Sequence, residues 1–110
     1  MIYGIIKITD DHKGEHYSIP TTYKPYAVVE ISKVYKNGYE QIDRTFYDKD
    51  GRMKKQVHSG HHDRKKQHPY GKHGEHTHTY QWDNEGKLIG KKVKEFTNKD
   101  RVESSDILRS

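Results

Sequence analysis

The 110-residue sequence contains no cysteine, which excludes a disulfide framework and a zinc site with thiolate ligands. It has no apolar run approaching the roughly 18 residues that a membrane-spanning helix needs. Its first residues also lack the layout of a signal peptide. We therefore expect no membrane partner and a cytoplasmic location.

Aliphatic residues are scarce. Leu, Ile, Val and Phe together number 19 of 110, and the formal net charge is +5, a combination typical of disordered chains. Nine tyrosines add apolar surface, however, and a single alanine is unusual for a helical protein, whereas Tyr, Ile and Val favour strands. We therefore predict a folded single domain over residues 1–110, with a thin core.

The pattern of apolar residues and turns predicts an antiparallel meander. Its strongest strand is 26–35, where Ala27, Val29 and Ile31 alternate on one face, and Asn-Gly at 37–38 favours a hairpin turn. The expected strands are 2–8, 26–35, 39–47, 52–58, 76–82 and 87–96. The predicted fold class is α+β and mainly β: a small curled antiparallel sheet, built as a meander of hairpins, with one C-terminal helix.

The C-terminal helix is expected to begin after a cap at Thr97 or Asn98 and to end near Leu108. Val102, Ile107 and Leu108 give it an apolar stripe. If the sheet leaves this stripe uncovered, a homodimer formed through the helix would bury it.

Turn length predicts which residues face one another across two hairpins. A four-residue loop at 83–86 would pair Trp82 with Lys87, which places Tyr80, Trp82, Ile89 and Val93 on the face of His76 and His78. A four-residue loop at 48–51 would place His58 across from Gln41 and near Asp43, which could orient the imidazole. How the two hairpins pair with each other is left open.

Positive charge is concentrated between Arg52 and His73, where seven Lys and Arg residues face a single acid, Asp63. Such a cluster favours a nucleic-acid partner, RNA or single-stranded DNA, although a solvated basic loop would have the same composition. The candidate nucleic-acid-binding residues are Arg64, Lys65, Lys66, Tyr70 and Tyr80.

Seven of the nine histidines fall between His58 and His78, and His76-Thr77-His78 on a strand places two imidazoles on one face. One use of this set is metal-independent cleavage of a phosphodiester by a general base and a general acid, with a lysine stabilising the developing charge. The candidate catalytic residues for such a ribonuclease-like domain, which needs no cofactor, are His68, Lys72, His76 and His78.

Two alternatives remain open at this stage. In one, His76 and His78 together with another histidine or Glu75 bind zinc or another divalent metal. In the other, the histidines are structural and pack against aromatic residues. Our leading hypothesis is a basic nucleic-acid-interacting protein. The second is a non-catalytic structural or interaction protein whose His-rich loop binds a divalent metal.

Two motifs resemble known bacterial sequences. YDKDGRM (47–53) and WDNEGKL (82–88) share one pattern and look like the YD repeats of Rhs-type secreted proteins. The stretch HPYGKHGEHTHTYQW (68–82) and the closing DIL (106–108) resemble small proteins of phages and bacterial mobile elements, and His-rich C-terminal domains of polymorphic Rhs-type toxins. This resemblance spans 47–108 and implies a bacterial or phage origin and a nuclease-like toxin domain. Met1 and the N-terminal strands instead favour a free-standing protein.

Overall fold

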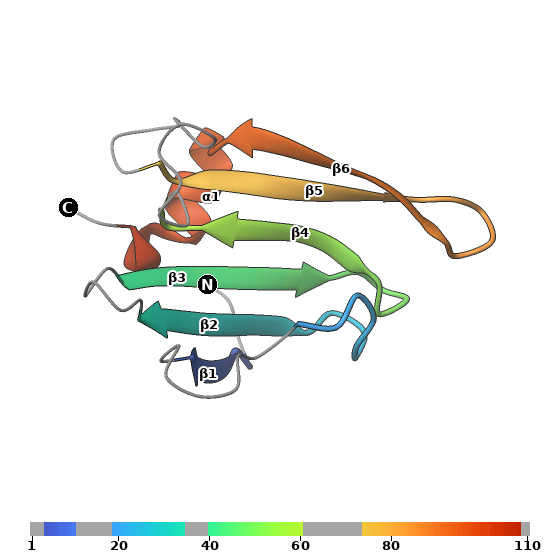
Figure 1. Cartoon of the computed structure of the whole chain (residues 1–110), viewed down its shortest axis with the longest axis horizontal. Coiled ribbons are helices and arrows are strands. Elements are labelled where there is room, and N and C mark those ends of the chain that lie inside the picture. The colour runs from blue at the N-terminus through green and yellow to red at the C-terminus, as the bar shows by residue number, and fades with distance from the viewer. Residues whose placement is uncertain (1–3, 11–18, 35–39, 61–73, 109–110) are drawn as a thin grey trace.

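The fold is given by a computed structural model, which describes residues 4–10, 19–34, 40–60 and 74–108. Six strands form one sheet in chain order: β1 (Ile6–Asp10), β2 (Val28–Val34), β3 (Glu40–Tyr47), β4 (Met53–His58), β5 (His76–Trp82) and β6 (Leu88–Glu95). A short helix, α1 (Asn98–Glu103), and a 3-10 turn, η1 (Ser105–Ile107), complete the described chain (Figure 1).

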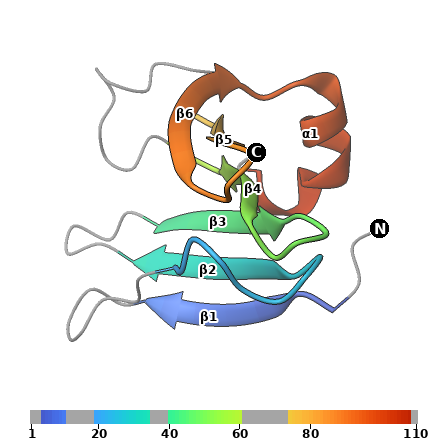
Figure 2. The ribbon, with the colours of Figure 1, turned by 90° about the vertical axis from the view of Figure 1, so that its right-hand side faces the viewer.

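The sheet is antiparallel from β2 to β6, which confirms the predicted mainly β fold. It is curled and does not close into a barrel (Figure 2). The first strand departs from a simple meander because β1 lies parallel to β2. Parallel neighbours need a crossover connection of about a dozen residues, and the chain between Asp10 and Val28 is long enough to provide one.

Apolar residues pack on both faces of the sheet. One cluster contains Val29, Ile31, Tyr47 and Met53, and the other contains Val57, Phe96 and Ile107. We call these the site face and the helix face, respectively. Among the described residues, eight buried side chains are hydrophobic and thirteen are polar or charged. The core is therefore thin, as predicted, and polar contacts complete the interior.

The predicted helix cap is confirmed. The Thr97 hydroxyl accepts a hydrogen bond from the Asp100 N–H, and the Asp100 carboxylate accepts one from the Thr97 N–H. This reciprocal capping box satisfies backbone donors that a helix start otherwise leaves open. The α-helix is shorter than expected, because it ends at Glu103 and the chain continues as η1.

An ion-pair network centred on the buried Arg44 links η1 to the helix face. Arg44 is 2% exposed, and its guanidinium donates to Glu30 on β2 and to both carboxylate oxygens of Asp106. Burial disfavours the charged guanidinium, but hydrogen bonds to Asp106 and Glu30 outweigh it and raise the pKa of Arg44. Ile107 is buried beside this network, whereas Val102 is 79% exposed. Of the expected apolar stripe, Ile107 is therefore covered by the protein's own sheet, whereas Val102 is not.

Neither α1 nor η1, the helical segments of the described residues, is long and apolar enough to cross a membrane.

The predicted pairing across both hairpins was wrong. The bonds from Asp48 N–H to the Arg52 carbonyl and from Asp83 N–H to the Lys87 carbonyl close loops of three residues rather than four. A further register shift follows in each hairpin, between residues 46 and 47 and between 81 and 82. As a result Trp82 pairs with Leu88, not Lys87, and the flanking Ile89 is 62% exposed.

Candidate functional site

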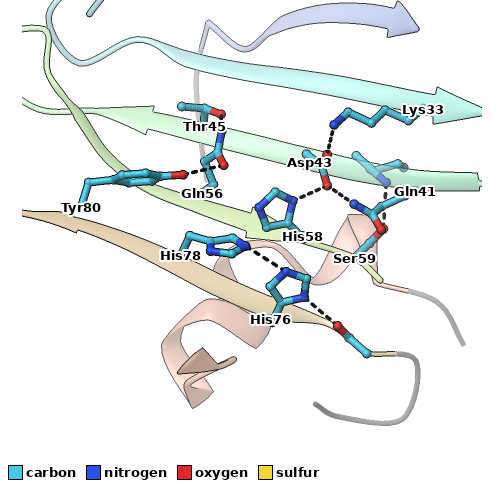
Figure 3. Close-up of polar contacts among 12 residues, drawn as sticks. Lys33, Gln41, Asp43, Thr45, Gln56, His58, Ser59, His76, His78 and Tyr80 are labelled. Carbon is cyan, nitrogen blue, oxygen red and sulfur yellow. Dashed lines mark hydrogen bonds and ion pairs between the residues drawn. The ribbon is translucent and has the colours of Figure 1, made fainter. Parts of the chain in front are cut away.

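Three buried histidines meet on the site face. His58 ends β4, whereas His76 and His78 begin β5, and His58 is the cross-strand partner of His76. The exposed fractions of His58, His76 and His78 are 4%, 0% and 6%. Each pair of rings has centroids 4.8 Å apart (Figure 3). The pairing of β4 with β5 and the alternation along β5 together place three imidazoles in one cluster.

A carboxylate holds the first of these rings. His58 Nδ1 lies 2.6 Å from Asp43 Oδ1, and Asp43 is the cross-strand partner of His58 on β3. The same oxygen accepts a hydrogen bond of 2.7 Å from Gln41 Nε2, and Lys33 Nζ lies 3.1 Å from Asp43 Oδ2. The expected contact between Asp43 and His58 is therefore present. The expected partner across the strand was wrong, because the register shift puts Asp43 rather than Gln41 opposite.

The other two rings are held by a backbone carbonyl and by each other. His76 Nδ1 lies 2.8 Å from the carbonyl oxygen of Gly74, which can only accept, so Nδ1 carries the proton. In the neutral ring this leaves the lone pair on His76 Nε2, which lies 3.1 Å from His78 Nε2. His78 Nε2 consequently donates in this contact. The arrangement fixes which nitrogen of His76 faces the cluster.

Next to the histidines, Tyr80 belongs to a second polar chain on the same face. Its hydroxyl donates to Gln56 Oε1 at 2.8 Å, and Gln56 Nε2 donates to the Thr45 hydroxyl at 2.9 Å. Burial and the nearby Asp43 carboxylate raise the pKa of Tyr80 to about 12. The phenol is thus held neutral, and its hydroxyl is engaged within the fold.

Three of the predicted site residues, His76, His78 and Glu75, lie close together and are buried. His76 and His78 are buried beside Tyr80 and Trp82, as strand parity predicted, and Val93 lies opposite His78. Glu75 is also buried, but its carboxylate accepts a hydrogen bond from Arg101 of α1. Arg64, Lys65, Lys66, His68, Tyr70 and Lys72 lie outside the described residues.

Sequence reasoning did not include His58 with the candidate ligands. It comes into contact with His76 only through the pairing of β4 with β5, which the sequence left open. Two flanking polar residues, Lys33 and Gln41, were also missed, because each belongs to a strand whose partner register determines what it contacts. The local signal that could have suggested this network is the placement of Asp43 on the same strand face as Gln41.

The cluster has the composition of a metal-binding site. Each histidine offers one ring nitrogen, and the three nitrogens lie within 4.8 Å of one another. Tetrahedral zinc, with Zn–N distances of about 2.0–2.1 Å, separates its ligand nitrogens by about 3.3 Å. The 3.1 Å between His76 Nε2 and His78 Nε2 is close to this value. His58 would need to move its donor nitrogen closer by at most about 1.5 Å.

Comparisons of the chain with protein-family models, curated proteins and solved structures gave no significant match. What the protein does has therefore to be inferred from the residues themselves.

Proposed function

We propose that the protein binds Zn²⁺ or a similar transition-metal ion through His58, His76 and His78. The observation that carries this proposal is the meeting of three nearly fully buried imidazoles, two of which present a ring nitrogen 3.1 Å apart. Imidazole suits zinc, copper, nickel and cobalt and is a poor ligand for magnesium or calcium. Near-complete burial of the rings also favours a small ion over a polymeric substrate.

The outer contacts support the same proposal. Metal-bound histidines usually donate their other ring N–H to a carboxylate or a backbone carbonyl, which orients the ring. Asp43 occupies that position for His58, and the Gly74 carbonyl occupies it for His76. Binding of an ion would replace the His76–His78 contact, and the proton of His78 would have to move from Nε2 to Nδ1.

Metal titration of chelator-stripped protein tests the proposal. We expect one Zn²⁺ or Co²⁺ per chain, with the intense visible absorption of tetrahedral Co²⁺. Changing any one of the three histidines to Gln should weaken binding at least as much as the roughly 10–100-fold cost of losing an outer contact. Unchanged affinity in the single variants His58→Gln, His76→Gln and His78→Gln would contradict the proposal.

A matched control separates the cluster from the four histidines of residues 61–73. A variant with all four histidines of 61–73 changed to Gln removes more imidazoles than any single variant above. We expect it to retain one tightly bound ion. Loss of binding in this control, but not in the single variants, would assign the metal to the 61–73 segment instead. The changed residues are His61, His62, His68 and His73.

A second candidate function, nucleic-acid binding, is favoured by the charge along β6. Four lysines in and next to this edge strand are exposed, and none of them forms an ion pair with a residue in the described part of the chain. Unpaired surface cations attract the phosphate backbone of RNA or DNA. These residues are Lys87, Lys91, Lys92 and Lys94.

Salt-dependent binding of single-stranded RNA tests this second candidate. The logarithm of the binding constant should fall linearly with the logarithm of the salt concentration. Changing Lys91, Lys92 and Lys94 to Gln should make this slope less steep by about 0.7 for each lost phosphate contact. The double variant Lys49→Gln/Lys54→Gln, which removes exposed lysines from the other hairpin, serves as control. Equal losses in both variants, or no binding at low salt, would exclude a nucleic-acid surface on β6.

The same RNA tests the ribonuclease hypothesis. Cleavage that persists with chelator and disappears in His76→Ala would support acid–base catalysis by imidazole. Cleavage that requires the metal would instead make the ion part of the reaction, and intact RNA under both conditions would leave a binding protein.

A further inference from the structure

We infer that Asp43 is a positioning residue that fixes the tautomer of His58, so that His58 Nε2 faces the other two histidines. The inference rests on the proposed metal-binding function and adds the residue that prepares one of its ligands. Asp43 is 3% exposed and lies in the centre of β3, one strand away from the histidine that it contacts (Figure 3).

Three described residues present hydrogen-bond donors to the Asp43 side chain. Gln41 Nε2 donates to Oδ1 at 2.7 Å, and Lys33 Nζ lies 3.1 Å from Oδ2. The third neighbour is His58 Nδ1, 2.6 Å from Oδ1. An ionised carboxylate has only acceptors, so it requires the proton of His58 on Nδ1. The lone pair of the neutral ring is then on Nε2, the nitrogen available to a metal.

Lys33 makes the carboxylate difficult to replace. Its side chain is 24% exposed, so its ammonium group reaches Asp43 from the edge of the buried region. In Asp43→Asn the single carbonyl oxygen would turn toward the Lys33 ammonium, which can only donate. The amide NH₂ would then take the position of Oδ1 and donate to His58 Nδ1, and Gln41, whose Nε2 donates to Oδ1 in the wild type, would turn its amide oxygen toward it. That contact stabilises the opposite tautomer, with the proton on Nε2 and no lone pair for a metal.

His76, the first residue of β5, provides an internal reference. His76 is oriented by the backbone carbonyl of Gly74, which does not depend on any side chain. A change at Asp43 should therefore alter the tautomer of His58 and leave that of His76 as it is. A general loss of packing would affect both rings.

Nitrogen-15 NMR of the imidazoles in metal-free protein tests the inference directly. We expect the Nδ1–H tautomer for His58 and His76 in the wild type, and a switch to Nε2–H for His58 alone in Asp43→Asn. Zinc affinity measured by chelator competition should fall by about 10–100-fold in the same variant. The control Thr45→Val removes a neighbouring acceptor for Gln56 on the same face and should leave both readings unchanged.

The possible outcomes separate this inference from the metal proposal. A wild-type His58 with its proton on Nε2 would overturn the positioning role, even if the protein binds zinc, and this measurement needs no variant. The expected tautomers in a protein that binds no zinc would overturn the metal proposal alone. A tautomer switch in Asp43→Asn without loss of zinc affinity would also overturn the inference. If Asp43→Asn fails to fold, Asp43→Glu, which retains a carboxylate, should keep the Nδ1–H tautomer.

Discussion

The two hairpins β3–β4 and β5–β6 have the same turn in different surroundings. In each turn the first Asp accepts two backbone N–H bonds, from Asp50 and Arg52 to Asp48 and from Glu85 and Lys87 to Asp83. Each turn ends in a glycine with positive φ, Gly51 at 74° and Gly86 at 82°. Turn chemistry is therefore determined locally, by the shared Asp and Gly residues.

What surrounds the two turns differs. The segment before β2 covers the first turn: Tyr23 N–H donates to the Gly51 carbonyl at 2.7 Å, and Tyr47 hydroxyl donates to the Pro20 carbonyl at 2.6 Å. In Figure 1 the second turn projects beyond the rest of the sheet. Among the described residues, Arg52 lies next to this turn, with its guanidinium 5.8 Å from the centre of the Trp82 ring. The same local pattern of Asp and Gly is therefore covered by another segment in the first hairpin and projects from the sheet in the second.

The largest effect that this comparison predicts concerns the two glycines. Alanine at either position costs about 1–2 kcal/mol because φ is positive. At Gly51 the new Cβ would also overlap the backbone carbonyl of Tyr23, whereas at Gly86 it would meet only the flexible end of Arg52, at 2.8 Å. We expect Gly51→Ala to lower the free energy of unfolding by about 3 kcal/mol and Gly86→Ala by about 1–2 kcal/mol.

Urea denaturation of both glycine variants measures this difference. A second substitution within the turn should not restore the stability of Gly51→Ala, because the new Cβ overlaps the backbone carbonyl of Tyr23, which belongs to the segment before β2. Equal destabilisation by the two substitutions would show that the segment before β2 contributes nothing to the first turn.

The next largest effect is stabilisation by the proposed metal, which would link the two hairpins at the ends opposite their turns. One ligand, His58, comes from the first hairpin, and His76 and His78 come from the second. An ion that binds only the folded protein, at 100 times its dissociation constant, adds about 2.7 kcal/mol to the free energy of unfolding. Thermal unfolding with and without Zn²⁺ should show this gain in Gly86→Ala as in the wild type, and its loss in His58→Gln.

The strands, the helix cap and the burial of His76 and His78 could be predicted from the sequence because they depend on short-range patterns. Alternation along β5 is such a pattern, and the capping box at Thr97 is another. The meeting of His58 with His76 could not be predicted. It requires the pairing of β4 with β5, and the position of Asp43 opposite His58 likewise requires the shifted register of β3 and β4. Both depend on long-range packing.

A smaller effect concerns Asp100, whose carboxylate contacts both hairpins. It lies 3.1 Å from Lys55 Nζ on β4 and accepts from the Thr77 hydroxyl on β5 at 3.3 Å. Burial raises the pKa of Asp100, but the hydrogen bonds from the Thr97 backbone and from Lys55 outweigh it, so the net pKa is lowered. The carboxylate therefore stabilises the fold above its ordinary pKa of about 3.9, and this contribution is lost as the pH falls through the lowered value.

Stability measured between pH 2 and pH 6 tests this assignment. The free energy of unfolding of the wild type should decrease as the pH falls below about 4, and the decrease should be smaller in Asp100→Asn. At pH 6 the variant should be less stable by about 1 kcal/mol, the usual cost of a lost helix cap. Asp50→Asn, in an exposed turn, is the control. An unchanged acid dependence in Asp100→Asn would contradict the role of this carboxylate.

The smallest effect concerns the aspartates that begin the two turns. Asp48→Ala and Asp83→Ala each remove an oxygen that accepts two backbone N–H groups, and in both cases water can reach part of the turn. We expect a loss of about 0.5 kcal/mol for each substitution. The loss should be somewhat larger for Asp48, since the carbonyl of this residue also accepts from Tyr26 N–H, so displacement of the turn disturbs a second segment. Denaturant titration of both variants, with the corresponding Asn variants as controls that keep one acceptor, measures the difference. A larger loss in Asp83→Ala would mean that local turn chemistry, rather than the covering segment, sets the stability of these hairpins.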